Sequence, residues 1–148
     1  IEKYDCVIIL DDDHIYHEKM FEILINEFIK NKKNYSYYVQ KVFKLNMGQG
    51  ADGILINTKD LDKIDKFYQK YVSNNKNLFL NDDLWISLYL QFIKNNKIED
   101  LSEEFKIKTN RNIVYRIHSD IDSLKNELSE GFLNRRKLAK LELSLIHI

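Results

Sequence analysis

The chain has 148 residues, with 23 basic and 23 acidic side chains and therefore no formal net charge at pH 7. Hydrophobic residues make up 44% of the sequence, which is enough for one packed domain. The balanced charge argues against the large positive field of a nucleic-acid binder, so we expect no nucleic-acid partner. No apolar run approaches the roughly 20 residues of a membrane-spanning helix, so we expect no membrane segment.

The two ends of the chain suggest a fragment. An apolar strand begins within six residues of Ile1, without the structure that normally precedes such a strand. The last residues, Leu143 to Ile148 (LSLIHI), resemble the translation of a sequencing adapter. We therefore expect an N-terminally truncated domain over residues 1–142 and treat residues 143–148 as a non-native tail. The single Cys6 excludes an internal disulfide and leaves the cellular compartment undetermined.

The first half of the chain predicts a strand, a helix and a second strand. Tyr4 to Leu10 (YDCVIIL) is apolar and β-branched and stops at three aspartates, as a buried strand does where its end reaches solvent. Apolar residues then recur at helical spacing over residues 18–30, which predicts a helix covering the sheet. Tyr35 to Leu45 (YSYYVQKVFKL) is aromatic and β-branched and predicts one strand.

The middle of the chain predicts a loop, a short strand and two helices. A glycine-bearing loop from Gly48 to Gly53 (GQGADG) precedes a short predicted strand, Ile54 to Ile56. Apolar spacing predicts a surface helix from Asp60 to Tyr71. From Leu84 onward apolar side chains cover nearly every direction around the axis, which predicts a mostly buried helix.

The C-terminal part predicts two further strands, Phe105 to Lys108 and Asn112 to Ile117, followed by helices over residues 120–128 and 133–141. Alternating strands and helices predict an α/β fold with a mixed, mainly parallel sheet flanked by helices. In such folds ligands collect at the C-terminal ends of strands.

Three aspartates, Asp11 to Asp13, follow the first predicted strand. Side chains alternate in extended backbone, so Asp11 and Asp13 are expected to point to one side and Asp12 to the other. A divalent cation would relieve their mutual repulsion, and hard oxygen ligands favour Mg²⁺ or Mn²⁺. The alternative is a solvated acidic turn or an N-cap of the helix that follows.

Three sequence blocks together resemble GT-A-fold nucleotide-sugar glycosyltransferases. CVIILDDDHIYHEKMFEILINEF is similar to their Asp-x-Asp segment, GQGADGILINTKDL to their acceptor-side loop and strand, and NDDLWISLYLQFI to their acidic motif at the start of a buried helix. The order and spacing of the blocks match from Tyr4 to Asn96. The resemblance implies a Rossmann-like GT-A fold, of which this chain would be the C-terminal part of the catalytic domain. The family's N-terminal nucleotide-binding half would precede Ile1.

The resemblance also implies a function, a metal site and a catalytic base. The chain would move a hexose from a nucleotide diphosphate sugar, with a UDP-sugar as the expected donor, to a hydroxyl of a glycan, lipid or protein. Asp11 and Asp13 would hold Mn²⁺ or Mg²⁺ against the diphosphate, with His118 as a third protein ligand. Asp83 or Asp82 would accept the proton of the attacking hydroxyl.

Further positions are assigned to donor or acceptor binding, namely Asp12, Gly50, Asp52, Gly53 and Trp85. Each of the assigned residues also has an ordinary structural interpretation. Loop glycines usually make turns, a lone Trp in an apolar helix is usually core, and acids that open a helix usually serve as N-caps. His118 fits a surface or capping histidine, and the spacing of His14 and His17 fits the start of a helix better than a zinc site.

Two other functions remain open on the sequence. A haloacid-dehalogenase-like, magnesium-dependent phosphohydrolase also places aspartates after a first strand. That family expects Thr or Val soon after its second acid, whereas this chain continues from Asp13 with His14 and Ile15. The third reading is a non-catalytic carbohydrate-binding or interaction module that keeps the fold without turnover.

Overall fold

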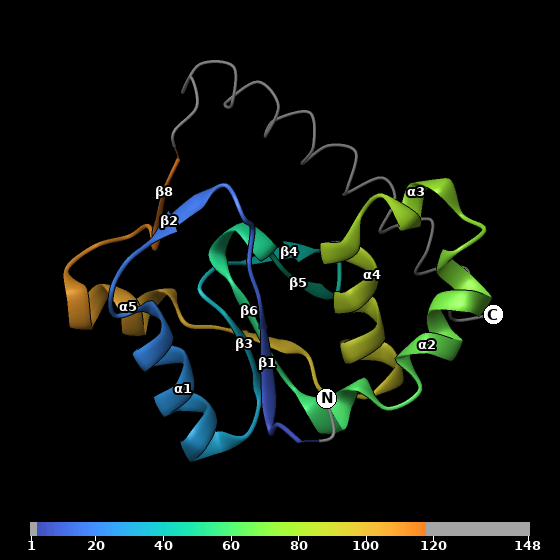
Figure 1. Ribbon diagram of the computed structural model, residues 1–148, viewed down its shortest axis with the longest axis horizontal. Helices are drawn as coiled ribbons and strands as arrows, with labels where there is room; N and C mark the ends of the chain where they lie inside the picture. Colours follow the sequence, from blue (N-terminus) through green and yellow to red (C-terminus); the bar gives the residue numbers. More distant parts are fainter. Residues whose placement is uncertain (1–2, 118–148) are drawn as a thin grey trace.

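A four-stranded sheet lies at the centre of the fold, in a computed structural model that describes residues 3–117 (Figure 1). Its strand order is β1-β6-β3-β7. Strand β6 runs antiparallel to both β1 and β3, and only the β3–β7 pair is parallel. The four strands are β1 (Cys6–Ile9), β3 (Asn34–Ser36), β6 (Ile54–Asn57) and β7 (Ile98–Asp100).

The predicted mixed sheet flanked by helices is confirmed, but the prediction that the sheet is mainly parallel is wrong. Antiparallel neighbours need no helical crossover, whereas parallel neighbours do. The chain between β3 and β6 contains only a hairpin and a short loop, so it returns beside β3 in the opposite direction. The one parallel pair, β3 with β7, is joined by the long segment that contains the helices after β6.

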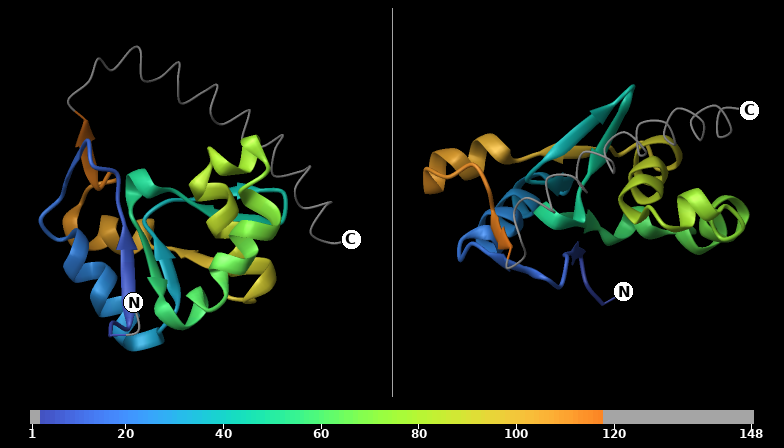
Figure 2. Two further views of the ribbon diagram at one scale, coloured as in Figure 1. Left: turned by 45° about the vertical axis from the view of Figure 1, so that its right-hand side comes forward. Right: turned by 90° about the horizontal axis from the view of Figure 1, so that it is seen from above.

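Helices cover both faces of the sheet (Figures 1 and 2). On one side lie α1 (Met20–Asn31) and α5 (Ser102–Thr109). On the other side lie α2 (Ile64–Phe67), α3 (Lys76–Phe79) and α4 (Asp82–Leu88). Helices α2 and α4 continue as wider π-type turns, over Tyr68–Val72 and Tyr89–Ile93. Short 3-10 turns span Gly50–Asp52 and Thr58–Leu61.

Two hydrophobic cores result from the alternation of side chains along the strands. In β6, Leu55 belongs to the core formed with α1 and α5, whereas Ile54 and Ile56 belong to the core formed with α2, α3 and α4. All three side chains are almost completely buried. Because successive strand residues face opposite sides, an apolar run without alternation is what a strand covered on both faces requires.

Two strand predictions need correction. Tyr35 to Leu45 is not one strand, because the chain bends after β3 and forms a separate hairpin of β4 (Val39–Val42) and β5 (Leu45–Gly48). Phe105 to Lys108 lies in helix α5 rather than in a strand. Asp100 Oδ1 accepts hydrogen bonds from Ser102 N at 2.7 Å and from Ser102 Oγ at 2.5 Å, so the side chain fixes the helix start.

The first strand is at the edge of the described sheet rather than buried inside it. Each of its four residues is only half-buried. The C-terminal strand prediction is confirmed only over β8 (Tyr115–Ile117), which pairs with β2 (His14–Tyr16) in a two-stranded ribbon. This ribbon replaces the helix start that we expected at His14 and His17.

The structure confirms two of the predicted helices and corrects a third. The predicted helix over residues 18–30 is confirmed as α1, which buries Met20, Leu24 and Phe28. The helix predicted from Asp60 is interrupted at Lys63, whose φ is +63°, before α2 begins. The buried helix predicted from Leu84 is confirmed as α4 and its π-type extension. The helices predicted over 120–128 and 133–141 and the tail over 143–148 lie outside the described residues.

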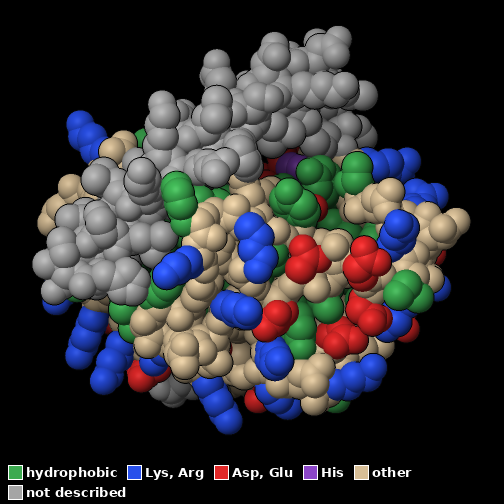
Figure 3. Space-filling view, turned by 180° about the vertical axis from the view of Figure 1, so that it is seen from behind, with side chains coloured by type: hydrophobic (Ala, Val, Ile, Leu, Met, Phe, Trp, Pro, Cys, Tyr) green, Lys and Arg blue, Asp and Glu red, His purple; other side chains and the backbone are tan. Residues whose placement is uncertain are grey.

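The surface carries both signs of charge on the face shown in Figure 3, where Lys and Arg side chains are interspersed with Asp and Glu. Within residues 3–117, none of the helices combines the length and apolar character that crossing a bilayer requires.

Gly53 gives a direct test of the packing between the sheet and α1. Its φ is +84°, and a Cβ there would lie 2.4 Å from Met20 Cε. We expect Gly53→Ala to lower the free energy of unfolding by about 2 to 4 kcal/mol, because it combines backbone strain with overpacking. Urea denaturation measures the change.

Gly50→Ala is the matched control for this substitution. Gly50 has no positive φ, and its nearest side-chain atoms are the ends of two flexible carboxylates at 3.1 and 3.3 Å. We expect it to cost less than about 1 kcal/mol. Equal destabilisation by both substitutions would contradict the special role of Gly53.

Candidate metal centre and acidic site

The acidic triplet occupies a turn between β1 and β2 rather than extended backbone. Strand β1 ends at Ile9, and residues 12 and 13 form the turn. The prediction that Asp11 and Asp13 point to one side because side chains alternate along a strand is therefore wrong. The turn nevertheless brings together ligand atoms of Asp11, Asp13 and His14, which all lie within 4.8 Å of one another. These three residues form a group that could hold a metal ion.

His14 is the member of this group that sequence reasoning missed. Its imidazole is 8% exposed, with Nδ1 2.5 Å from Asp13 Oδ1 and 4.0 Å from Asp11 Oδ2. The edge of the ring packs against Tyr115 with centroids 4.4 Å apart. The pairing of β2 with β8 therefore holds the histidine beside the acids. A histidine directly after three aspartates was the available signal, but the expected helix start obscured it.

The Tyr16 hydroxyl connects the acidic turn to the glycine loop. Asp11 N donates a hydrogen bond to Tyr16 Oη at 3.1 Å. Tyr16 Oη in turn lies 3.4 Å from both Asp11 O and Gly50 O, as its possible acceptors. Burial raises the pKa of Tyr16 to about 12, so the hydroxyl keeps its proton at neutral pH. Tyr16 is thus a neutral link that adds no charge to an acidic site.

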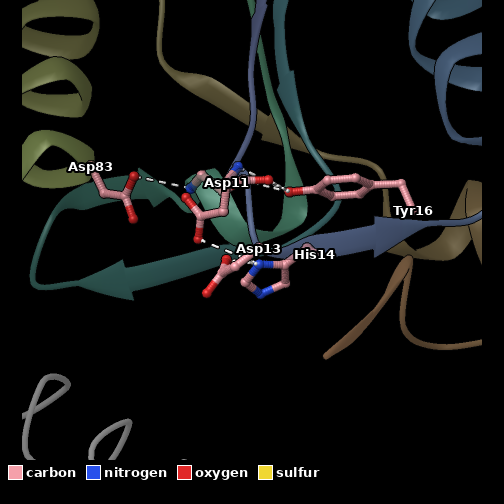
Figure 4. A network of polar contacts seen from close by, with 6 residues as sticks. Asp11, Asp13, His14, Tyr16 and Asp83 are labelled. Carbon is pink, nitrogen blue, oxygen red and sulfur yellow. Dashed lines mark hydrogen bonds and ion pairs between the residues drawn. The ribbon is translucent and has the colours of Figure 1, made fainter. Parts of the chain in front are cut away.

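Asp11 and Asp83 come from distant parts of the chain, and both carboxylates lie close to Gly50 (Figure 4 shows the two acids). Gly50 N donates a hydrogen bond to Asp83 Oδ1 at 2.9 Å. A Cβ on Gly50 would lie 3.1 Å from Asp11 Oδ1 and 3.3 Å from Asp83 Oδ1. The missing side chain therefore lets an acid of the β1–β2 turn and an acid of α4 approach the same backbone position closely.

Asp52 adds a third chain segment to the acidic site. Burial is the main reason that its pKa rises to about 7. The His14 charge acts in the opposite direction, while the negative charges of Asp83, Asp100 and Asp11 raise the pKa further. Burial, and to a smaller extent the neighbouring negative charges, therefore disfavour ionisation of Asp52.

The remaining predicted residues are placed differently. Asp82 Oδ1 accepts a hydrogen bond from Trp85 Nε1 at 3.0 Å, and the half-buried Trp85 packs beside Tyr68 with ring centroids 5.4 Å apart. Asp12 is exposed and does not belong to the metal-binding group. Gly53 is buried against α1. His118, the predicted third metal ligand, lies outside the described residues.

The structure therefore brings together five of the predicted residues, Asp11, Asp13, Gly50, Asp52 and Asp83, and adds His14 and Tyr16. Two carboxylates and an imidazole are ligands that suit divalent cations such as Mn²⁺, and carboxylates also suit Mg²⁺. No protein-family model, curated protein or solved structure matches this chain. Function must therefore be inferred from the chemistry of the site.

Manganese binding tests the proposed ligands. We expect Asp13→Asn to raise the dissociation constant of Mn²⁺ about tenfold or more, since even partners outside the first ligand shell contribute that much to metal affinity. Electron paramagnetic resonance of unbound Mn²⁺ measures the constant.

The control for this experiment is Asp12→Asn, which removes the same charge from the same turn but from a residue outside the group. We expect it to change the constant by less than about threefold, because water screens an exposed charge. Equal losses in the two variants would indicate general electrostatic attraction instead of a site.

Asp52 predicts a pH dependence of stability in the metal-free protein. Its pKa is about 7 when folded, against an ordinary value of 3.8. The folded state thus holds the proton more tightly, and stability is lost as pH rises from about 4 to about 7. The expected loss is on the order of 4 kcal/mol. Asp52→Asn should remove it in urea titrations with a chelator present, whereas parallel curves for the two proteins would contradict the raised pKa.

Proposed function

We propose that the protein is a metal-dependent glycosyltransferase that moves a hexose from a nucleotide diphosphate sugar to a hydroxyl acceptor. One observation carries the proposal. The carboxylates of Asp11 and Asp83, which are far apart in sequence, approach the same residue, Gly50, beside a group that could hold a cation. In this proposal a cation that activates the leaving group would lie next to the catalytic base.

The cation would neutralise the diphosphate that leaves the donor. Asp11, Asp13 and His14 are the ligands that we assign to it, so His14 takes the role first given to His118. A divalent ion between carboxylates and phosphate oxygens stabilises the negative charge that develops as the glycosidic bond breaks. It would also relieve the repulsion that raises the pKa of Asp52.

Asp83 is the residue that we assign as the catalytic base. The hydrogen bond from Gly50 N fixes its carboxylate beside Gly50, as a group that removes a proton must be fixed. Asp82 instead faces Trp85 Nε1. Asp83 would take the proton of the acceptor hydroxyl while the hydroxyl oxygen attacks the anomeric carbon of the donor sugar.

The three blocks that resemble GT-A enzymes support this proposal by their position. They supply, in turn, Asp11, Gly50 and Asp83, and these residues meet in the fold although more than 30 positions separate each from the next. The backbone at Gly50 would contact the acceptor or the donor sugar, as a residue without a side chain allows. A UDP-sugar remains the proposed donor, with Mn²⁺ or Mg²⁺ as the cofactor and a glycan, lipid or protein hydroxyl as the acceptor.

The test uses the complete polypeptide with a panel of UDP-hexoses, Mn²⁺ and mixed glycan acceptors, and it measures released UDP. We expect Asp83→Asn to lower kcat about 100-fold or more, because a general base contributes at least that factor. The donor KM should change little, since Asp83 is not among the assigned cation ligands. Asp82→Asn is the matched control and should retain most of the activity.

Several results would contradict the proposal. Equal activity of Asp83→Asn and the unchanged protein would rule out the assigned base, and UDP release that persists after chelation would rule out the cation. Phosphate release from a simple phosphomonoester with Mg²⁺, without UDP release, would favour the phosphohydrolase. Glycan binding without any turnover would favour a non-catalytic module.

A further inference from the structure

A cavity lies along the β2–β8 ribbon, and Tyr16, which also connects the acidic turn to the glycine loop, is part of its lining. It has a volume of about 360 Å³, and its lining includes Arg111, Arg116, Ile15 and Ile113. Figure 1 shows the ribbon beside α5, on the side of the molecule away from α2 and α3. None of these four residues has a part in the proposed transfer reaction.

The register of the ribbon separates Arg116 from the cation-binding group. Ile15 pairs directly with Arg116, and His14 and Tyr16 are the neighbours of Ile15 along β2. Paired residues of an antiparallel ribbon point to the same face, and successive residues point to opposite faces. Strand alternation therefore assigns Arg116 to the face opposite His14, while Tyr16 and Tyr115 of the His14 face also contribute to the cavity lining.

The cavity has an excess of positive charge. None of the ion pairs among residues 3–117 includes Arg111 or Arg116. Among residues 3–117, Glu18 is the one acid that lines the cavity, against two guanidinium groups. Guanidinium groups favour an anion, and their planar fork of N–H donors matches phosphate oxygens.

The floor of the cavity is fixed by contacts within the fold. His17 N donates a hydrogen bond to Val114 O at 2.7 Å, which extends the β2–β8 pairing beneath the cavity. Val114 is 2% exposed, and the His17 ring packs edge-on against Phe105 of α5 with centroids 5.3 Å apart. The backbone at His17 and Val114 is therefore held in place without a ligand, which lowers the entropic cost of ordering it on binding.

We propose that this cavity binds the phosphate group of an amphipathic ligand through Arg111 and Arg116. The apolar part of the ligand would lie against Ile15 and Ile113, which are 42% and 63% exposed. Exposed β-branched side chains beside two arginines suit a phosphate carried on a hydrocarbon body better than inorganic phosphate alone. A soluble phosphomonoester and a phospholipid headgroup share this chemistry.

The experiment titrates the complete polypeptide with phenyl phosphate by calorimetry, with a chelator present so that no cation bridges the anion to the acidic site. In parallel, the protein is sedimented with phosphatidylcholine vesicles that contain phosphatidylglycerol. The double variant Arg111→Gln/Arg116→Gln should bind both probes about tenfold more weakly or worse, because charge-assisted contacts to phosphate are lost. Inorganic phosphate should bind more weakly than phenyl phosphate in the unchanged protein.

The matched control is Lys59→Gln/Lys66→Gln, which removes the same charge from exposed lysines of the 3-10 turn and α2. Loss of phenyl phosphate binding in the arginine variant but not in the lysine control supports a soluble ligand. Loss of vesicle binding in the arginine variant but not in the lysine control supports a lipid headgroup. Binding of neither probe by the unchanged protein, or an equal loss in the lysine control, overturns the proposal.

This proposal does not depend on the proposed transferase activity, and the same protein variants distinguish the two proposals. Asp13→Asn should keep its affinity for phenyl phosphate, since the acidic turn does not line the cavity. Conversely, the arginine variant should keep its affinity for Mn²⁺. A failure of manganese binding therefore leaves this proposal standing, and a failure of phosphate binding leaves the cation site standing.

Discussion

Repulsion among the carboxylates around Gly50 is the constraint on which the rest of the site depends. Asp11, Asp52 and Asp83 come from three chain segments, and their proximity is one reason that the pKa of Asp52 rises to about 7. Local contacts compensate part of this cost, since Gly50 N donates to Asp83 and His14 lies against Asp13. A divalent cation would reduce the remaining repulsion.

The position of β6 explains how the fold brings these acids together. As the antiparallel strand between β1 and β3, β6 begins at the end of the sheet where β1 finishes, because Ile9 pairs with Ile54. The glycine loop just before β6 therefore lies beside the acidic turn after β1. Helix α4 packs against β5, the strand that leads into the same loop, and its first turn presents Asp83 to Gly50.

The β2–β8 ribbon gives the two proposed sites a common element with separate faces. One face presents His14 to the acids, and Tyr16 continues that face toward the glycine loop. The other face carries Arg116 and Ile15, which line the cavity along the ribbon. Because strand residues alternate, a ribbon of three paired residues can hold an acidic and a basic site apart without a further layer of structure.

The sequence by itself determined those elements whose own pattern of apolar residues shows which of their faces are buried. The apolar periods of α1 and α4, the uniform apolar run of β6 and the end of β1 at three aspartates all follow from the burial each segment needs. The tertiary structure decided which acids meet, that His14 belongs to a strand, that α5 is a helix, and that the sheet is mostly antiparallel. These features depend on pairing between residues distant along the chain, such as His14 with Ile117 and Gly50 with Asp83. Periodicity within one segment carries no record of such partners.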